Sequence, residues 1–504
     1  MKLEFERKDG LSCVEFIYKG VAGNLALEYE LAFLEAWSFG FDKENHTAFS
    51  NEGNRENNLV KFHGLKVINH YPSQGEDISL FIKATIEQYG MCMILTDLYD
   101  IPWSATCYQK RHWTHAILIT DIIATGYYCY DFYAMEGIVL PTDKLVTVYK
   151  IVTFQATTIA APVNDFKSFR GLLIETLNKK IECCNAFGSM ESFADDIRNC
   201  LDIHEIAKDA DSFENSKFIN SVNRVAQCRF QFASVLEYAN QKYPEAHFEE
   251  CISLLKKCAV SWKSITALLI KAYLVKDTKR VLQKVANKVL EAKQLEEYVY
   301  SELKKHLHNQ NCGKIAKTNT VHTAIIYHHY DLSAVFNHKA FGDHNNSQKA
   351  CYEHRSFIMI DDSLQKRYLV AGDLSFRLGE VETATYDNVE CCGQKLSIDR
   401  NCSAIMILAN AEFDHQIDKM GIESEEGYSE IEIATSSWQC TPILGDQVLW
   451  SGTGAVQYAN DIVKESGKKH LFGKKYLLPH SVYINNINLP DNPNFHIYAL
   501  TLCE

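Results

Sequence analysis

The chain has 504 residues, of which 46% are hydrophobic and 23% are charged, the profile of an ordinary globular protein of about three domains. Its formal net charge of -13 argues against non-specific binding to the nucleic-acid backbone, which is itself an anion. The first ten residues lack the apolar core of a signal peptide, and no apolar run reaches the length of about 18 residues that predicts a membrane span.

Seventeen cysteines are present, an odd number with no C-x-x-C pair. The adjacent pairs Cys183–Cys184 and Cys391–Cys392 suit neither a structural zinc site nor an ordinary disulfide. The pattern therefore predicts reduced thiols, a cytoplasmic protein and no metal site.

Residues 1–160 mix helix and strand patterns. The segment EDISLFIKATIEQYG predicts a helix that ends at Gly90, followed by a strand in MCMILTDLY. HAILITDII and GYYCYDFYA predict two strands around a turn near Thr125–Gly126, and DKLVTVYKIVTFQA predicts a further strand or strand pair. This part is expected to be an α+β domain. The polar stretch NHTAFSNEGNRENN is expected to be a surface loop.

Two further zones follow. Residues 161–318 carry apolar positions at three-to-four spacing, for example in FEECISLLKKCAVSWKSITALLIKAYLV, and predict a helical bundle that ends in a linker, HNQNCGKIAKTNT. Residues 319–504 contain short alternating segments such as CSAIMILANAEF, YSEIEIATSSW and NFHIYALTL, which predict a β-sandwich. The fold class is thus multidomain.

Cys13 stands where a nucleophile is expected. Ser12 and Glu15 fit a capping box, so that Cys13 falls in the first turn of a helix, where the helix dipole favours a thiolate. The alternative is a buried, inert thiol, the commoner fate of a cysteine.

His115 opens a predicted strand, and Asp131 lies in the strand after the turn. Each is eight residues from a turn centred near residue 123, which would place them side by side. Asp131 would then fix the tautomer of His115 and stabilise its charged form. A Cys on a helix, then a His and an Asp on strands, is a papain-like order.

The segment LTDLYDIPWSATCYQKRHWTHAILITDI resembles the butirosin-biosynthesis protein H N-terminal family: an apolar strand ends in Asp-hydrophobic-Tyr, a Pro-aromatic pair follows, and a His opens the next strand. SCVEFIYKGVAGNLALEYELAFLEAWSFGF is similar to the start of that family. The resemblance covers about residues 10–150.

This resemblance implies a papain-like (cysteine-peptidase-like) domain and a cysteine acyltransferase of antibiotic-type specialised-metabolite biosynthesis. Cys13 would be the nucleophile, His115 the general base and acid, and Asp131 the orienting residue. The acyl group would come from the phosphopantetheine thioester of an acyl or peptidyl carrier protein, as in nonribosomal peptide assembly, and pass to a small amine. No cofactor is bound by the chain itself.

Five residues near His115 are candidates for substrate binding. Asp97 and Tyr99 end a strand and would line the cleft; Lys110 and Arg111 would hold a pantetheine phosphate or an acidic carrier; His112 is an alternative base. The alternatives are capping residues, solvated loop charges and a loop histidine. Many papain-like enzymes place a Gln before the Cys for the oxyanion, but the first Gln here is Gln74, which argues more against peptide hydrolysis than against thioester exchange.

The last 180 residues resemble a jelly-roll β-sandwich found on carbohydrate-active enzymes, with an Asp-Asn-Val…Gly-Gln turn. The resemblance directs attention to possible sugar contacts from six side chains: Asn337, Lys339, Asp387, Asn388, Gln394 and Trp438. A turn held by Asn388 and Gln394, with Trp438 in the core, is the structural alternative. Two other functions stay open for the whole chain: a papain-like amidase or peptidase, and a non-enzymatic carbohydrate-binding protein.

Overall fold

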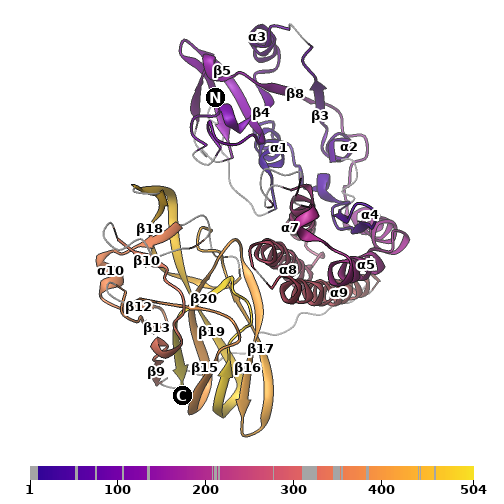
Figure 1. Cartoon of the computed structure of the whole chain (residues 1–504). Helices are drawn as coiled ribbons and strands as arrows, with labels where there is room; N and C mark the ends of the chain where they lie inside the picture. Colours follow the sequence, from indigo (N-terminus) through magenta and orange to yellow (C-terminus); the bar gives the residue numbers. More distant parts are fainter. Residues whose placement is uncertain are drawn as a thin grey trace. The chain divides into compact units, whose positions relative to one another are not determined.

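The computed structural model describes residues 10–50, 55–73, 76–104, 107–132, 137–206, 208, 213, 216–275, 277–308, 326–343, 352, 356–381, 385–440, 442, 444–458 and 461–504. The chain separates into two compact units (Figure 1). One takes the chain up to residue 259 and again from 286 to 312, and the other takes 260–285 and everything from 313 onward. The predicted three-domain division at residues 160 and 318 stays a prediction, and the predicted linker falls almost entirely outside the described residues.

A six-stranded sheet forms the scaffold of the first unit. Its strand order is β3-β8-β4-β5-β6-β7, and every neighbouring pair is antiparallel. The strands are β3 (Leu65–His70), β4 (Cys92–Asp97), β5 (Thr114–Ile123), β6 (Gly126–Asp131), β7 (Ile138–Pro141) and β8 (Val148–Ala156). A separate hairpin pairs β1 (Gly40–Asp42) with β2 (Thr47–Phe49).

Helices α1 (Cys13–Asn24) and α3 (Ile78–Tyr89) cover opposite faces of this sheet. Ile82 of α3 packs in one core cluster with Ile151 of β8, whereas Tyr18 of α1 contacts the ring of Phe154, which faces the other way along the same strand. As predicted, α3 ends at Gly90, which adopts the left-handed conformation (φ 77°) that glycine tolerates.

The β5–β6 hairpin forms as predicted, but its predicted register was wrong by two residues. Asp131 pairs with Ile117, not with His115, because the turn lies later in the chain and the register shifts between Ile119 and Asp121. Asp131 is therefore a diagonal neighbour of His115 on the same face of the sheet.

Helices dominate the chain between the two sheets, as the periodicity predicted. After the short α2 (Arg55–Asn58), they are α4 (Phe166–Leu177), α5 (Ala186–Asn199), α6 (Ile203–Ile206), α7 (Lys217–Lys242), α8 (Glu249–Leu274) and α9 (Thr278–His308). Shorter helical turns are η1 (Glu30–Phe33), η2 (Leu59–His63), η3 (Leu98–Asp100), η4 (Thr142–Lys144) and η5 (Asn178–Cys183).

A buried ion pair joins α7 to α9. Arg229 is fully buried and binds both carboxylate oxygens of Glu296, at 2.9 and 2.8 Å, while Nη1 donates to the carbonyl of Ser38. Trp37 also donates to Glu296. The carboxylate thus ties the segment before β1 to two helices.

The second unit is built on a β-sandwich whose described strands belong mainly to one continuous hydrogen-bonded sheet, with the path β10-β11-β18-β19-β15-β20-β14. Three further strands belong to the same sheet but lie outside this path: β16 pairs with β17 and β19, and β9 pairs with β20. The bounds are β9 (Tyr327–Tyr330), β10 (Phe341–Gly342), β11 (Ser356–Met359), β14 (Val389–Glu390), β15 (Lys395–Ala411), β16 (Gln416–Ser424), β17 (Gly427–Thr435), β18 (Gln447–Tyr458), β19 (Asp461–Asn488) and β20 (Phe495–Cys503). A small hairpin pairs β12 (Tyr368–Ala371) with β13 (Leu374–Arg377), and short helical pieces are η7 (Ser333–Val335) and α10 (Asp362–Gln365).

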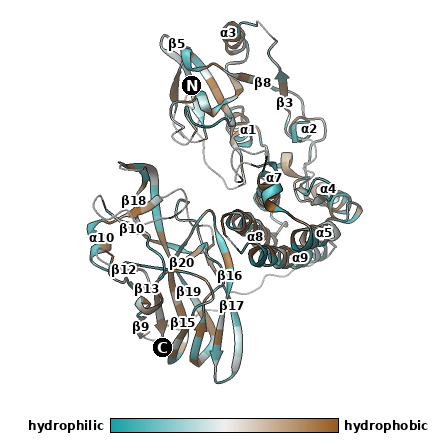
Figure 2. Ribbon diagram, viewed as in Figure 1, coloured by the Kyte–Doolittle hydropathy of each residue, from teal (hydrophilic) through white to brown (hydrophobic). Residues whose placement is uncertain are grey.

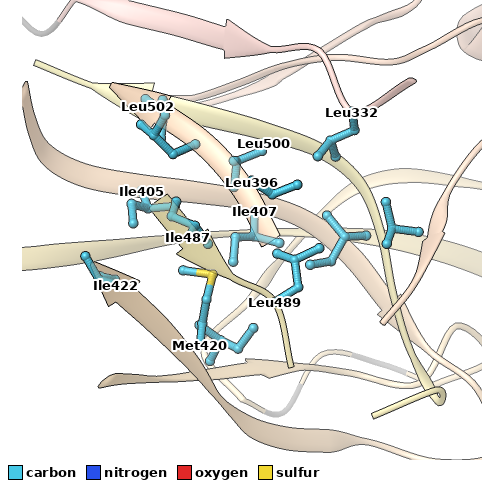
Figure 3. Close-up of a cluster of buried hydrophobic side chains, with 14 of the residues drawn as sticks. Leu332, Leu396, Ile405, Ile407, Met420, Ile422, Ile487, Leu489, Leu500 and Leu502 are labelled. Atoms are coloured by element: carbon cyan, nitrogen blue, oxygen red, sulfur yellow. The ribbon is translucent and has the colours of Figure 1, made fainter. Parts of the chain in front are cut away.

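Both faces of the central strand β15 are buried. Ile405 and Ile407 enter one core cluster, shown in Figure 3 with Met420 of β16, whereas the alternate residues Met406 and Leu408 enter another. In Figure 2, where the ribbon is coloured by hydropathy, brown hydrophobic stretches occur along strands of this unit. A strand with two apolar faces reads as a continuous hydrophobic run, which explains the sequence SAIMILANA.

Candidate active site

Cys13 is the first residue of α1, as the capping pattern predicted. Ser12 has extended backbone geometry at the N-cap, and Glu15 accepts hydrogen bonds from both the N–H and the hydroxyl of Ser12. Helix α1 packs against β5, the strand that carries His115 (Figure 1). The start of α1 therefore places the Cys13 thiol next to the sheet.

The N-terminal turn of α1 is anchored by two arginines that sequence reasoning missed. Glu15 is buried and forms ion pairs with Arg55, from the start of α2, and with Arg224 Nη2 of α7 at 2.8 Å. Arg55 lies in the stretch predicted to be a polar surface loop; that prediction was wrong for this residue, because its guanidinium is largely buried against Glu15.

The segment just before α1 is fixed to α7 as well. Gln231 donates to the carbonyl of Gly10 at 2.8 Å. Gly10 has φ +84°, and a Cβ at this position would lie 2.5 Å from Cβ of Phe230, so only glycine fits here without a shift.

His115, the second residue of β5, is 3% exposed and faces both other members of the predicted triad. Its Nε2 lies 3.1 Å from Oδ2 of Asp131, and its side chain also forms a hydrogen bond with the Cys13 thiol. Burial alone would lower the pKa of His115, but hydrogen bonds to Asp131 and Cys13, together with their negative charges, raise the pKa to about 9.

The pKa of Cys13 moves in the opposite direction. Burial opposes ionisation of the thiol, but the hydrogen bond and positive charge of His115, joined by the backbone N–H of Ala116, outweigh it and hold the pKa below its usual range. The pair therefore favours a thiolate beside an imidazolium, the state that nucleophilic cysteines need.

Asp131 is completely buried, and its Oδ2 accepts side-chain hydrogen bonds from Nε2 of His115 and, at 3.0 Å, from Nε1 of Trp103. Sequence reasoning did not single out Trp103. The Pro102–Trp103 pair, noted only as part of a family resemblance, was the signal that could have found it.

Asp97 organises a second group of side chains at the end of β4. It accepts backbone N–H groups from Tyr99 and Trp113, Nδ1 of His112 at 2.8 Å and the hydroxyl of Tyr149 at 3.1 Å. Burial opposes its ionisation, but these donors lower the pKa of Asp97. The structure therefore brings together Asp97, Tyr99 and His112, and adds Tyr149 of β8.

Lys110 and Arg111 lie on the exposed loop before β5. The backbone N–H groups of both donate to the carbonyl of Cys107, while the residues themselves are exposed. Both thus lie on the exposed loop that leads to His112.

In the sandwich, the six side chains considered for sugar binding are engaged within the fold. Asp387 accepts the N–H groups of Ala340 and Phe341 and pairs with Lys339 at 2.9 Å. Asn388 donates to the carbonyl of His338. Asn337 and Gln394 bond to the backbone around Glu390, and Trp438 is fully buried in a core cluster. The turn-and-core interpretation matches these contacts.

A metal site and a membrane-spanning helix are two further features to consider. Within the described ranges, no group of three or more His, Cys, Asp or Glu side chains is arranged to hold a metal ion. None of the helices in the described part of the chain is long and apolar enough to cross a membrane.

Comparison with known proteins finds a family model that matches the C-terminal part of the chain. Residues 328–504 match the AziU2-like beta-sandwich domain. This match supports the sandwich assignment for the C-terminal part of the chain. A search of curated proteins found no significant match.

Proposed function

We propose that the protein is a cysteine-dependent acyltransferase of specialised-metabolite biosynthesis, built on a papain-like N-terminal domain. One observation carries the proposal: Cys13 at a helix start forms a hydrogen-bonded pair with the buried His115, which Asp131 orients in turn. The match of the C-terminal domain to a family linked to antibiotic biosynthesis supports the biosynthetic setting.

In the first step, the Cys13 thiolate attacks the carbonyl carbon of a thioester donor. The donor thiolate leaves with the proton of the His115 imidazolium, so that acyl-Cys13 and a neutral His115 remain. Exchange of one thioester for another is nearly thermoneutral, which suits a phosphopantetheine thioester on a carrier protein as donor. An amine then attacks acyl-Cys13, and His115 accepts a proton from the attacking nitrogen.

The developing oxyanion needs hydrogen-bond donors. The first N–H groups of a helix have no acceptor within the helix, and that of Cys13 lies beside the sulfur that carries the acyl group. We assign this N–H and the positive end of α1 to the oxyanion.

The test is intact-protein mass spectrometry after incubation with N-acetylcysteamine thioesters of small acyl groups. The wild type should gain one acyl group that added amines remove, and Cys13→Ala should gain none. Cys183→Ser, which removes an exposed thiol outside the site, is the matched control and should behave as wild type.

Absence of any adduct on Cys13 across a panel of thioesters would overturn the proposal. An adduct that water removes as fast as amines do would instead indicate a hydrolase that uses the same three residues.

A further inference from the structure

The strand pair β15–β20 of the second unit carries a cluster of polar side chains that the acylation chemistry does not use. Asn410 pairs with His496 across the two strands, and the N–H of Glu412 donates to the carbonyl of Asn494, which continues the same register. Because side chains alternate along a strand, these four side chains face the same side of the sheet. Asn494 is thus the direct cross-strand neighbour of Glu412, and His496 is its diagonal neighbour.

Two of these side chains are fully buried and keep polar atoms without a hydrogen bond. Among the residues that the structure describes, neither the amide oxygen nor the amide nitrogen of Asn494 has a hydrogen-bond partner, and Nε2 of His496 has none either. A buried polar group without a partner costs free energy, and in folded proteins most such groups are paired. Three such atoms on one face of one strand pair indicate a place where a ligand supplies the partners.

The hydrogen bonds on the other side of the His496 ring show which nitrogen carries the proton. Nδ1 lies 2.9 Å from Oδ1 of Asn388, whose amide nitrogen donates to Asp387 and to the carbonyl of His338. Nδ1 therefore carries the proton, and Nε2 is an acceptor. Burial keeps the ring neutral, because it lowers the pKa of His496 to about 3. Nε2 lies 3.5 Å from Oε2 of Glu412, and no hydrogen bond joins these two acceptors.

We propose that Glu412, Asn494 and His496 bind the primary ammonium group of a small amine. A primary ammonium has three N–H donors, and these side chains supply three kinds of acceptor: a carboxylate, an amide oxygen and an imidazole nitrogen. An alcohol offers one O–H donor and no positive charge. The cluster meets solvent at Glu412, whose side chain is 10% exposed. No residue of the acylation chemistry takes part, so this inference does not rest on the proposed function.

The charges near the cluster favour a cation. Lys271 of α8 forms an ion pair with Glu390 at 3.0 Å. Burial opposes the protonation of Lys271, but the negative charges of Glu390 and Glu412 raise its pKa. These two carboxylates therefore already stabilise one ammonium group here, and they would act on a bound ammonium in the same way.

Thermal unfolding of the full chain tests the binding with three probes: methylammonium chloride, tetramethylammonium chloride and methanol. Methylammonium has a positive charge and three N–H donors, tetramethylammonium keeps the charge without a donor, and methanol has a donor without a charge. Methylammonium should raise Tm with saturation, by roughly 2–4 °C at tenfold excess over its Kd. The other two probes should leave Tm unchanged when the ionic strength is held constant with sodium chloride.

Asn494→Leu and Asn492→Leu form a matched pair of variants. The side chain of Asn492 is paired, since its Nδ2 donates to Gln416 and Asp418 at 3.1 and 3.0 Å. Without ligand, Asn494→Leu should raise Tm, because an apolar side chain of similar size replaces an unpaired buried amide, whereas Asn492→Leu should lower Tm. Asn494→Leu should also lose the response to methylammonium.

Glu412→Gln separates the role of charge from that of shape. It removes the negative charge and keeps a side chain of the same length, so the Kd of methylammonium should rise roughly tenfold or more. An unchanged Kd would show that the carboxylate does not hold the ammonium group, and would overturn the inference.

Two other outcomes would also overturn it. Equal stabilisation by tetramethylammonium or by methanol would show a general effect of cations or of hydroxyl groups. No response of the wild type to methylammonium, together with a lower Tm of Asn494→Leu, would show that a buried water serves the amide. Acylation of Cys13 is measured separately, so none of these outcomes bears on the proposed function.

Discussion

Two shifted pKa values set the pH range in which the residues of the site can react. Below the lowered pKa of Cys13 the thiol is protonated and cannot attack; above about 9 His115 loses the proton that the leaving thiol needs. The acylation rate should therefore rise, level off and fall again near pH 9. Rapid-quench mass spectrometry of Cys13 acylation at a series of pH values checks this prediction.

His115→Ala removes the group that lowers the pKa of Cys13. Alkylation of Cys13 by iodoacetamide at pH 7 should then fall roughly tenfold or more, because an ordinary thiol is only a few per cent ionised there. A flat pH profile in wild type, with no loss in the variant, would mean that the thiolate does not depend on His115.

In the proposed mechanism, Trp103 acts through Asp131 as a positioning residue. Trp103→Phe keeps an aromatic ring but removes the N–H that donates to Oδ2, so that buried Asp131 loses this donor and keeps the one from His115. The loss of about 1–2 kcal/mol in orientation should slow acylation roughly tenfold. The falling limb of the pH profile should also move, which a purely steric effect would not cause.

At the scale of the element, two glycines test how α1 is placed. Gly10→Ala should destabilise the protein by more than about 1 kcal/mol, since φ is +84° and the new Cβ meets Phe230. Gly23→Ala, within α1 and with open space around it, should instead be neutral or stabilise by up to about 1 kcal/mol. Chemical denaturation of both variants gives the comparison; effects of the same sign would contradict the described packing.

Helices and strands were readable from the sequence wherever the pattern was local. Gly90 ended α3 as expected, and Ser12 with Glu15 marked the start of α1. The register of β5 with β6 was not readable, since a shift between Ile119 and Asp121 leaves no mark in the alternation of apolar residues.

The partners of Glu15 were hidden for another reason. Arg55 and Arg224 lie 40 and 209 positions away along the chain. Arg55 occurs in a stretch predicted to be a polar surface loop, and Arg224 in a segment predicted to be a helix of the bundle. Likewise, Trp103 reads as a loop aromatic until the fold brings its N–H to Asp131. The geometry of the site depends on tertiary contacts of this kind, and no local sequence pattern predicts them.

At the scale of the whole molecule, every residue assigned to the acylation chemistry lies in the first unit, whereas α8 contributes to both. A chain that ends at residue 312 removes Asp414 and Glu390, the partners of Lys263 and Lys271 on α8, at 2.9 and 3.0 Å. The free energy of unfolding of the helices should fall by about 3 kcal/mol or more. Alkylation of Cys13 should persist at the rate of the full chain, and its loss would show that the second unit shapes the site.

The pairing of Glu15 with Arg224 has a consequence for the newly made protein. During synthesis, Cys13 emerges from the ribosome long before Arg224, so the helix that presents the thiol lacks one of its two guanidinium anchors until α7 has been made. His115 and Asp131 also arrive later than Cys13. In the nascent chain, Cys13 thus has the reactivity of an ordinary thiol. We expect its reactivity to rise only after translation has passed the middle of the helical region. For the proposed function, the order of the sequence therefore delays the reactivity of Cys13 until its partners have been made.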